Sequence, residues 1–145
     1  MFRNKASTYA VLSILEIAKR AAGADKPTGV QAGEVAEVYG LPTAYAAKVM
    51  SQLARSRILR SDRGPRGGFQ LARPASEITM LETIEAVNGI IDGRQDAEQS
   101  GAPEGIQTGL SEVFGSATDA VRDVLGGMTI EKFVDQFCGT PAASE

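Results

Sequence analysis

Arginines and glycines crowd one short segment, residues 61–74, with the sequence SDRGPRGGFQLARP. Strand-forming residues flank the glycines, which predicts a β-hairpin with its tip at residues 63–68. Glycine permits positive φ and close approach of the backbone to another surface. Arg63 and Arg66 at such a tip could contact phosphates or enter the electronegative minor groove of DNA. A glycine-rich hairpin can equally be an ordinary turn, so the elements around it must decide.

Helices are predicted directly before the hairpin. Residues 32–38 and 44–57 carry apolar residues at helical spacing and are separated by a turn that starts at Gly40, with Thr43 as the expected cap of the second helix. Two helices joined in this way form a helix-turn-helix candidate. A hairpin after such a unit is expected to be a wing. The predicted apolar stripe of the second helix is Tyr45, Val49, Met50 and Leu53.

A further helix is expected at residues 7–22, with Ser7 as its cap and Gly23 as its end. Its predicted apolar positions are Val11, Leu12, Leu15 and Ala18.

Charge is distributed unevenly along the chain. Residues 1–75 carry 12 Lys and Arg against 5 Asp and Glu, whereas residues 76–145 carry 3 against 13. A basic half in a protein of net charge −3 is typical of a polyanion-binding module, because cations that neutralise phosphates release counterions. Solvated surface charges would give the same counts. Together with the predicted wing, the asymmetry favours double-stranded DNA as the partner.

Composition argues against most catalytic sites. The 145 residues include no histidine and one cysteine, Cys138, so the commonest general base and metal ligand are absent. Neighbouring carboxylates such as Glu82 and Glu85 are better interpreted as a solvated helix face than as an acid–base pair. We therefore expect no enzyme activity and no catalytic residue.

Targeting signals are not expected either. No run approaches the roughly 18 apolar residues of a membrane span, and the first residues lack a signal-peptide pattern. We expect no membrane partner and a cytoplasmic location.

The acidic half predicts helices that pair two chains. Thr79 and Glu82 form a predicted capping box for a connecting helix at residues 79–91, and the residues that follow, 92–109, are expected to form a mobile loop. The loop carboxylates could bind a hard cation, although such loops are usually solvated. Apolar residues then recur at spacings of 3 and 4, as in a helix that packs along a partner helix or on its own domain. They are Leu110, Val113, Phe114, Ala117, Val121, Val124 and Leu125.

A last helix is expected from residue 130, with Thr129 as its cap. Its residues Ile130, Phe133, Val134 and Phe137 are expected to face inward.

A family resemblance rests on specific segments. STYAVLSILEIA and VAEVYGLPTAYAAKVMSQLARSRILRSDRGPRGGFQLARPASEITMLETIEAVNG resemble the winged-helix regulators of the IscR, NsrR and CymR family. The most specific mark is R-G-x-x-G-G-[FY]-x-L-A-R followed by an Ile-Thr segment. The resemblance implies a dimeric bacterial transcription factor whose helix from Thr43 enters the major groove and whose wing tip enters the minor groove. The DNA-binding residues that it implies are Thr43, Ala44, Ala47, Lys48, Arg63, Gly64, Pro65, Arg66, Gly67 and Gly68. Alanines at two of these positions offer only methyl contacts, so Lys48 and the wing must supply more of the discrimination.

One departure from the family concerns its sensor. Many members hold an iron–sulfur cluster through three cysteines in the loop after the segment equivalent to EAVNG, whereas residues 92–109 contain neither Cys nor His. We expect no cofactor and no metal, and control by a small molecule or a partner protein near the loop and the long helix.

The sequence thus predicts a mainly α fold with a small β-hairpin wing. The expected parts are a winged helix-turn-helix at 1–78, a connecting helix at 79–91, a loop at 92–109, dimerisation helices at 110–138 and a tail at 139–145. The expected function is a DNA-binding transcriptional regulator, a repressor that binds an inverted-repeat operator as a homodimer. The alternative is a winged-helix protein-interaction module that does not bind DNA.

Overall fold

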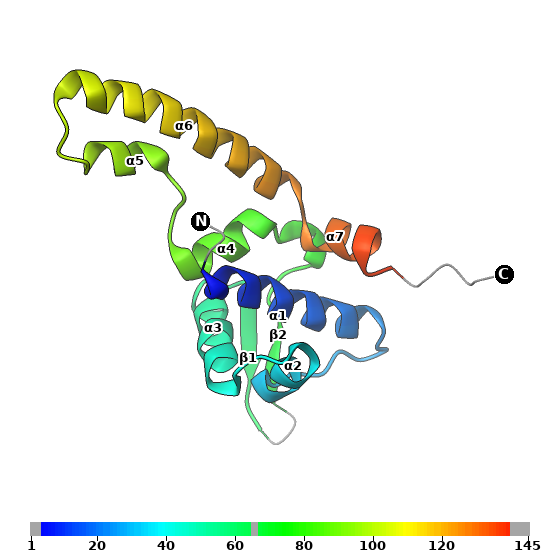
Figure 1. Ribbon diagram of the computed structural model, residues 1–145. Coiled ribbons are helices and arrows are strands. Elements are labelled where there is room, and N and C mark those ends of the chain that lie inside the picture. Colours follow the sequence, from blue (N-terminus) through cyan, green and yellow to red (C-terminus); the bar gives the residue numbers. More distant parts are fainter. Residues whose placement is uncertain (1–3, 65–66, 140–145) are drawn as a thin grey trace.

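The computed structural model describes residues 4–64 and 67–139 (Figure 1). Its elements confirm the predicted mainly α fold with a small hairpin. In chain order they are α1 (Lys5–Ala22), α2 (Ala32–Tyr39), α3 (Thr43–Arg55), β1 (Leu59–Asp62), β2 (Gly68–Leu71), the 3-10 turn η1 (Ala75–Glu77), α4 (Met80–Asn88), α5 (Gly93–Glu98), α6 (Glu104–Gly127) and α7 (Ile130–Phe137).

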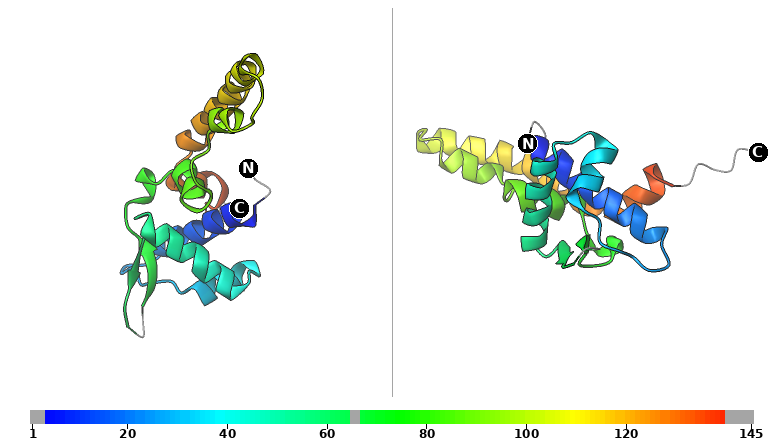
Figure 2. Two further views of the ribbon diagram at one scale, coloured as in Figure 1. Left: turned by 90° about the vertical axis from the view of Figure 1, so that its left-hand side faces the viewer. Right: turned by 90° about the horizontal axis from the view of Figure 1, so that it is seen from below.

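The helices α5 and α6 form an arm that projects from the winged region made by α1 to α4. The end of β1 and the start of β2 lie at the opposite end of the molecule from this arm (Figures 1 and 2). Among the described residues, no helix has the length and apolar character needed to cross a membrane.

The central helix of the winged region is α1, which contacts α2, α3, α4, α7 and β2. Ala10, Ile14 and Ile17 are at most 2% exposed, whereas the predicted positions Val11 and Leu12 are only half-buried. Because neighbours surround this helix on several sides, its buried residues extend beyond a single stripe. The predicted spacing therefore captured only part of its buried surface.

Two helix starts differ from the prediction. Asn4 caps α1, because its side chain accepts a hydrogen bond from the N–H of Ala6 at 2.8 Å, while Ser7 is buried inside the helix. Thr43 is the first residue of α3 and follows Pro42 at the N-cap position. Pro42 has an extended backbone, and no side-chain hydrogen bond caps the start of α3.

The caps of α4 and α7 confirm the prediction in part. Thr79 accepts from the N–H of Glu82 at 3.2 Å, and Thr129 accepts from the N–H of Lys132 at 3.1 Å. The reciprocal half of the box at α4 is not formed, because the Glu82 carboxylate pairs with Arg73 instead. An ion pair with a residue nine positions away is not visible in a local motif.

The expected loop at residues 92–109 contains α5 and the start of α6. Asp92 caps α5 by accepting from the N–H of Arg94 at 3.0 Å, and Gly93 and Ala97 are buried beside α6. A helix of six residues is marginal in isolation, so packing on α6 stabilises it. Composition alone cannot show this packing, and the prediction of a loop over the whole segment is wrong.

The base of α6 is fixed to the winged region. Backbone N–H···O bonds of 2.9 and 2.8 Å join residues 78–80 to residues 128–130, and Ile130 is fully buried there. α7 then packs on α1. Phe137, predicted to face inward, is 68% exposed, and its ring contacts that of Phe133 with centroids 4.8 Å apart.

Candidate nucleic-acid interface

The turn between α2 and α3 fixes the direction of α3. Gly40 ends α2 in the left-handed conformation at φ +65°, which glycine adopts without a Cβ penalty. The N–H of Leu41 donates to the carbonyl of Ala36 at 2.9 Å and closes the turn. This part of the chain forms the predicted helix-turn-helix.

The predicted DNA-contacting residues of α3 lie on one side of the helix. Its other side, with Ala46, Val49, Met50 and Leu53, is at most 1% exposed. Three of the predicted residues, Thr43, Ala44 and Lys48, are exposed, and Ala47 is half-buried.

Two further polar residues continue this face of α3. Ser51 and Arg55 follow Lys48 by three and seven positions, which places them on the same side one and two turns further along. Arg55 is exposed and Ser51 is half-buried. The sequence prediction did not include them, although helical spacing from Ala44 and Lys48 could have identified both.

The wing is an antiparallel pair whose inner side reaches the core. Leu59 pairs with Leu71, and Ser61 pairs with Phe69. Val30, from the loop before α2, adds a bridge to Phe69 with N–O distances of 2.9 and 2.8 Å. The wing is therefore attached along one edge to the region that precedes the helix-turn-helix.

Three glycines permit close backbone approaches beside this attachment and within the hairpin. A Cβ on Gly68, where φ is +147°, would lie 2.7 Å from the backbone of Val30, and one on Gly29 would lie 2.9 Å from the nitrogen of Gly68. A Cβ on Gly67 would lie 2.4 Å from the carbonyl oxygen of Asp62. Gly67 is buried and Gly68 is half-buried, so both glycines pack against backbone at the turn end of the hairpin.

The tip itself carries Arg63 and Gly64, which are both exposed. Gly64 has φ +110°, and the space around its Cα is open. Glycine is therefore favoured there by the backbone conformation of the turn and not by a close contact. The predicted tip residues Pro65 and Arg66 lie outside the described residues.

The outer face of the wing carries a row of polar side chains. The guanidinium of Arg60 donates to Gln70 Oε1 at 3.1 Å, and the amide of Gln70 donates to the carboxylate of Asp62. These bonds tie β1 to β2 next to Arg63 and stiffen the strand that leads to the tip.

A buried carboxylate joins α1 to both ends of α2. Glu16, 7% exposed, accepts from Arg20 at 3.1 Å and from the hydroxyl of Tyr39 at 3.1 Å. Arg20 also donates to Glu34 at 3.0 Å, and Glu34 accepts from the N–H of Gln31 at 2.7 Å at the start of α2. Because α2 leads into the turn before α3, this network positions the helix-turn-helix.

The protonation of this network is set by its own members. Burial raises the pKa of Glu16, but hydrogen bonds from Arg20 and Tyr39 and the charge of Lys19 outweigh it, so its pKa lies below the ordinary value. Burial and the Glu16 carboxylate raise the pKa of Tyr39 to about 12. At neutral pH the carboxylate is charged and the phenol is a donor.

The predicted dimerisation stripe of α6 is largely open to solvent. Its members Val113 and Val124 are 65% and 72% exposed, and Phe114 is 41% exposed. Ala117 is exposed, and Leu110, Val121 and Leu125 are half-buried. Ile106, at 56% exposure, extends the stripe toward the start of α6.

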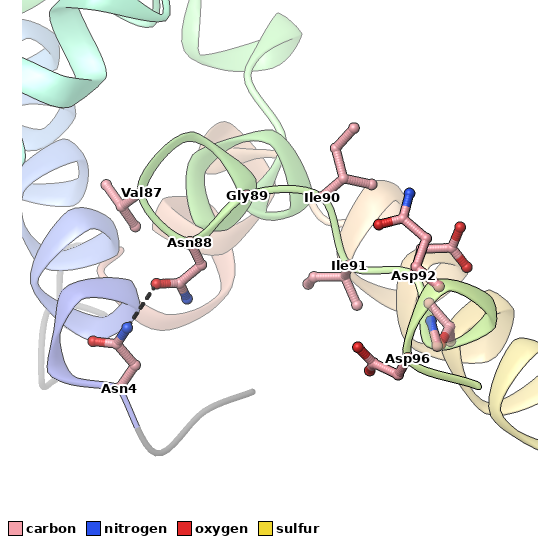
Figure 3. A pocket seen from close by; sticks show the side chains of 11 residues that line it. Asn4, Val87, Asn88, Gly89, Ile90, Ile91, Asp92 and Asp96 are labelled. Carbon is pink, nitrogen blue, oxygen red and sulfur yellow. Dashed lines mark hydrogen bonds between the residues drawn. The ribbon is translucent and has the colours of Figure 1, made fainter. Parts of the chain in front are cut away.

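A hollow of about 520 Å³ lies where α4 meets the arm (Figure 3). Asn4 and Asn88 border it and share a hydrogen bond of 2.9 Å. The side of the arm contributes Asp92 and Asp96, and Ile90 between them and α4 is 73% exposed.

Comparisons with known proteins agree on one family. Residues 3–136 match the profile of the family described as Rrf2, iron-dependent transcriptional regulator. A helix-turn-helix-type transcriptional regulator of Mycobacterium tuberculosis is 29% identical over 123 residues, which cover 84% of this chain and 74% of the relative. IscR of Photorhabdus laumondii is 26% identical over 127 residues, or 88% and 75% of the two chains. These relatives are named as transcriptional regulators rather than as enzymes.

Solved structures share the fold. CymR, the global cysteine regulator of B. subtilis, superposes with a TM-score of 0.74 at 22% identity and covers 92% of this chain and 95% of its own. IscR of T. potens gives 0.73 at 18% identity and covers 97% and 92%. The fold is that of the winged-helix regulators.

The iron dependence in the family description does not fit the residues of this chain. Cluster ligands are cysteine thiolates, sometimes with histidine, and residues 92–109 contain neither. Cys138, the only thiol in the sequence, follows α7. Within residues 4–64 and 67–139, no three His, Cys, Asp or Glu side chains gather as a metal site would require. We assign no role to a cluster in this chain.

Proposed function

Because the chain belongs to the Rrf2 family of transcriptional regulators, we propose that it represses transcription by binding an inverted-repeat operator as a homodimer. One observation carries the proposal. The start of α3 and the end of β1, which leads to the wing tip, lie at the same end of the molecule, opposite the arm (Figures 1 and 2). Two surfaces with cationic side chains can thus meet one face of a duplex together.

In this proposal α3 lies in the major groove. Lys48 contacts a base or phosphate there, Thr43 donates or accepts a hydrogen bond, and Ala44 and Ala47 offer methyl contacts. Arg55, at the far end of the same face, contacts the backbone. The exposed Arg63 at the wing tip enters the adjacent minor groove, where the potential is negative.

The second copy is held through α6. A single winged unit supplies few phosphate contacts, and pairing two units raises affinity and specificity together. The apolar stripe of α6, with Val113 and Val124 largely exposed, supports pairing by this helix. An isologous pair requires a two-fold symmetric operator.

An effector of this regulator is received near the hollow at residues 88–96. That hollow lies between the winged region and the arm, so a small molecule or partner protein seated there can change their relative orientation.

The test is binding to duplexes selected from a randomised pool, compared with random duplex over a salt series. We expect tight binding to the selected duplex that weakens steeply with salt. Lys48→Ala should lose more affinity on the selected duplex than on random duplex if Lys48 contacts a base, by about 1–3 kcal/mol. Equal losses on both would make Lys48 a phosphate contact. Failure of the wild-type protein to enrich any duplex would favour a protein-interaction module instead.

A further inference from the structure

In this chain, side chains fix the segment that follows α4. We call Gly93, Arg94, Gly115, Thr118 and Asp119 the clasp. The N–H of Gly93 donates to Thr118 Oγ1 at 2.9 Å, and the Thr118 hydroxyl donates to the carbonyl of Phe114 at 2.7 Å. Thr118 is 5% exposed, so this chain of hydrogen bonds is shielded from water.

Small residues bring the two helices of the arm into contact. A Cβ on Gly93 would lie 2.7 Å from both the Phe114 carbonyl oxygen and Thr118 Oγ1. A Cβ on Gly115 would lie 2.7 Å from the guanidinium carbon of Arg94. The space beside Gly93 is thus filled by α6, and the space beside Gly115 is filled by the Arg94 side chain of α5.

An ion pair closes the clasp on its outer side. The guanidinium of Arg94 donates to the two carboxylate oxygens of Asp119 at 3.0 and 2.7 Å, a two-point contact that fixes the rotation of α5 on α6. The hydrogen bonds from Arg94 lower the pKa of Asp119, so the carboxylate stays charged at neutral pH.

A joint ties the arm to α4. Glu85 accepts from the N–H of Ile91 at 2.8 Å and from Arg122 at 2.6 Å, and Arg122 also donates to the carbonyl of Ile91 at 3.3 Å. The clasp and this joint together fix residues 91–94, at the start of the segment between α4 and α6.

The clasp also determines which side of α6 is available. α5 covers the side that carries Gly115 and Thr118, while Val113 and Val124 remain exposed on the other side. If α5 left α6, both sides of α6 would be exposed. A second copy of the chain could then pack on α6 in more than one arrangement.

We propose that the clasp, acting in place of a metal cluster, holds α5 on α6 and thereby keeps the protein in its DNA-binding form without iron. The effect on DNA rests on the function proposed above, whereas the effect on α5 does not. The side chains present support this inference: the segment that would need cysteines has none and is instead held by a hydrogen bond to Thr118 and an ion pair to Asp119.

The experiment compares wild type with Thr118→Val and Asp119→Ala after anaerobic purification. Thr118→Val keeps the shape and removes the acceptor for Gly93, and Asp119→Ala removes the partner of Arg94 on an exposed surface. Asp123→Ala, an exposed carboxylate on the same helix outside the clasp, is the matched control. Three quantities are measured: iron and sulfide content, amide hydrogen exchange over residues 92–98, and affinity for a selected duplex with and without an iron chelator.

We expect the wild-type protein to contain no stoichiometric iron or sulfide. Its affinity for the selected duplex should be the same with and without the chelator. Amide exchange over residues 92–98 should be about tenfold faster in both clasp variants and unchanged in Asp123→Ala. Affinity for the selected duplex should fall several-fold in the clasp variants only.

Stoichiometric iron and sulfide with chelator-sensitive binding would overturn the proposal. The proposal would also be overturned if amide exchange over residues 92–98 in both clasp variants were as slow as in the wild type. If wild type binds no duplex, the proposed function fails, and the exchange and metal measurements, which need no DNA, still decide the role of the clasp.

Discussion

Arg63 is the residue with which the wing contacts DNA in this account. Arg63→Ala should weaken binding to a selected duplex by about 1–3 kcal/mol, because it removes a cation from the minor groove. The thermal midpoint should be unchanged, since the Arg63 side chain is exposed. Fluorescence anisotropy on the selected duplex measures the loss.

Lys132→Ala is the control for Arg63→Ala. It removes one positive charge from α7, away from the wing and α3, and should change the affinity little (Figure 1). Equal affinities of Arg63→Ala and wild type would remove the wing from the mechanism.

Glu16 predicts a pH dependence of stability. Its pKa is lowered in the folded state, so its contribution is present above the unfolded value of about 4.3 and is lost as the pH falls through the folded value. Glu16→Gln should cost about 1–3 kcal/mol at neutral pH, because Arg20 and Tyr39 lose a charged acceptor. The difference between the urea unfolding midpoints of wild type and Glu16→Gln should shrink as the pH is lowered from 7 into the acid range. A constant difference at every pH would contradict the assignment.

Single residues differ in how far the sequence reveals them. Lys48 and Arg63 could be named from charge and spacing, and Arg55 could have been found in the same way. The role of Gly68 could not be deduced, because its need for glycine comes from the backbone of Val30, which lies far away in the sequence.

Among the elements, the wing depends on its glycine contacts. Gly68→Ala should destabilise the protein by about 1–3 kcal/mol, because a Cβ would meet the Val30 backbone at a positive φ. DNA affinity should fall as well, since the start of β2, next to the wing tip, must shift. Denaturant unfolding and duplex binding measure the two effects.

A matched glycine lies in the first turns of α6. A Cβ on Gly105 meets nothing within 4 Å, so Gly105→Ala should be neutral or stabilising by up to about 1 kcal/mol. If both alanine variants behaved alike, the close approach of Gly68 to Val30 would not matter to stability.

Elements with strong local signals were predicted well, and those that depend on distant packing were not. α2, α3 and the hairpin follow from apolar spacing and turn residues, within one or two positions at their ends. α5 has a polar composition and six residues, and it exists because α6 offers Gly115 and Thr118 to pack on. No pattern inside residues 92–98 could have indicated this.

At the scale of the molecule, the exposed stripe of α6 predicts the assembly. Val113→Glu together with Val124→Glu should give a monomer, because each change removes about 1.5–3 kcal/mol of apolar burial and adds the desolvation of a charge. Both side chains are at least 65% exposed in one protomer, so its fold should be retained. Sedimentation velocity and circular dichroism check the two expectations.

Ser116→Glu is the control for this pair, because Ser116 is exposed on another side of the same helix. It should leave the dimer intact. A dimer that survives the Val113 and Val124 changes would place the interface elsewhere on the molecule.

The most direct test of the account is a hydroxyl-radical footprint of the wild-type protein on a selected duplex, with the stoichiometry measured in parallel. We expect two protomers per duplex and two equivalent protected patches on one face, with centres separated by a whole number of turns of about 10 base pairs. Each patch should include minor-groove protection that disappears in Arg63→Ala. One protected patch bound by one protomer, or protection that Arg63→Ala leaves unchanged, would contradict it.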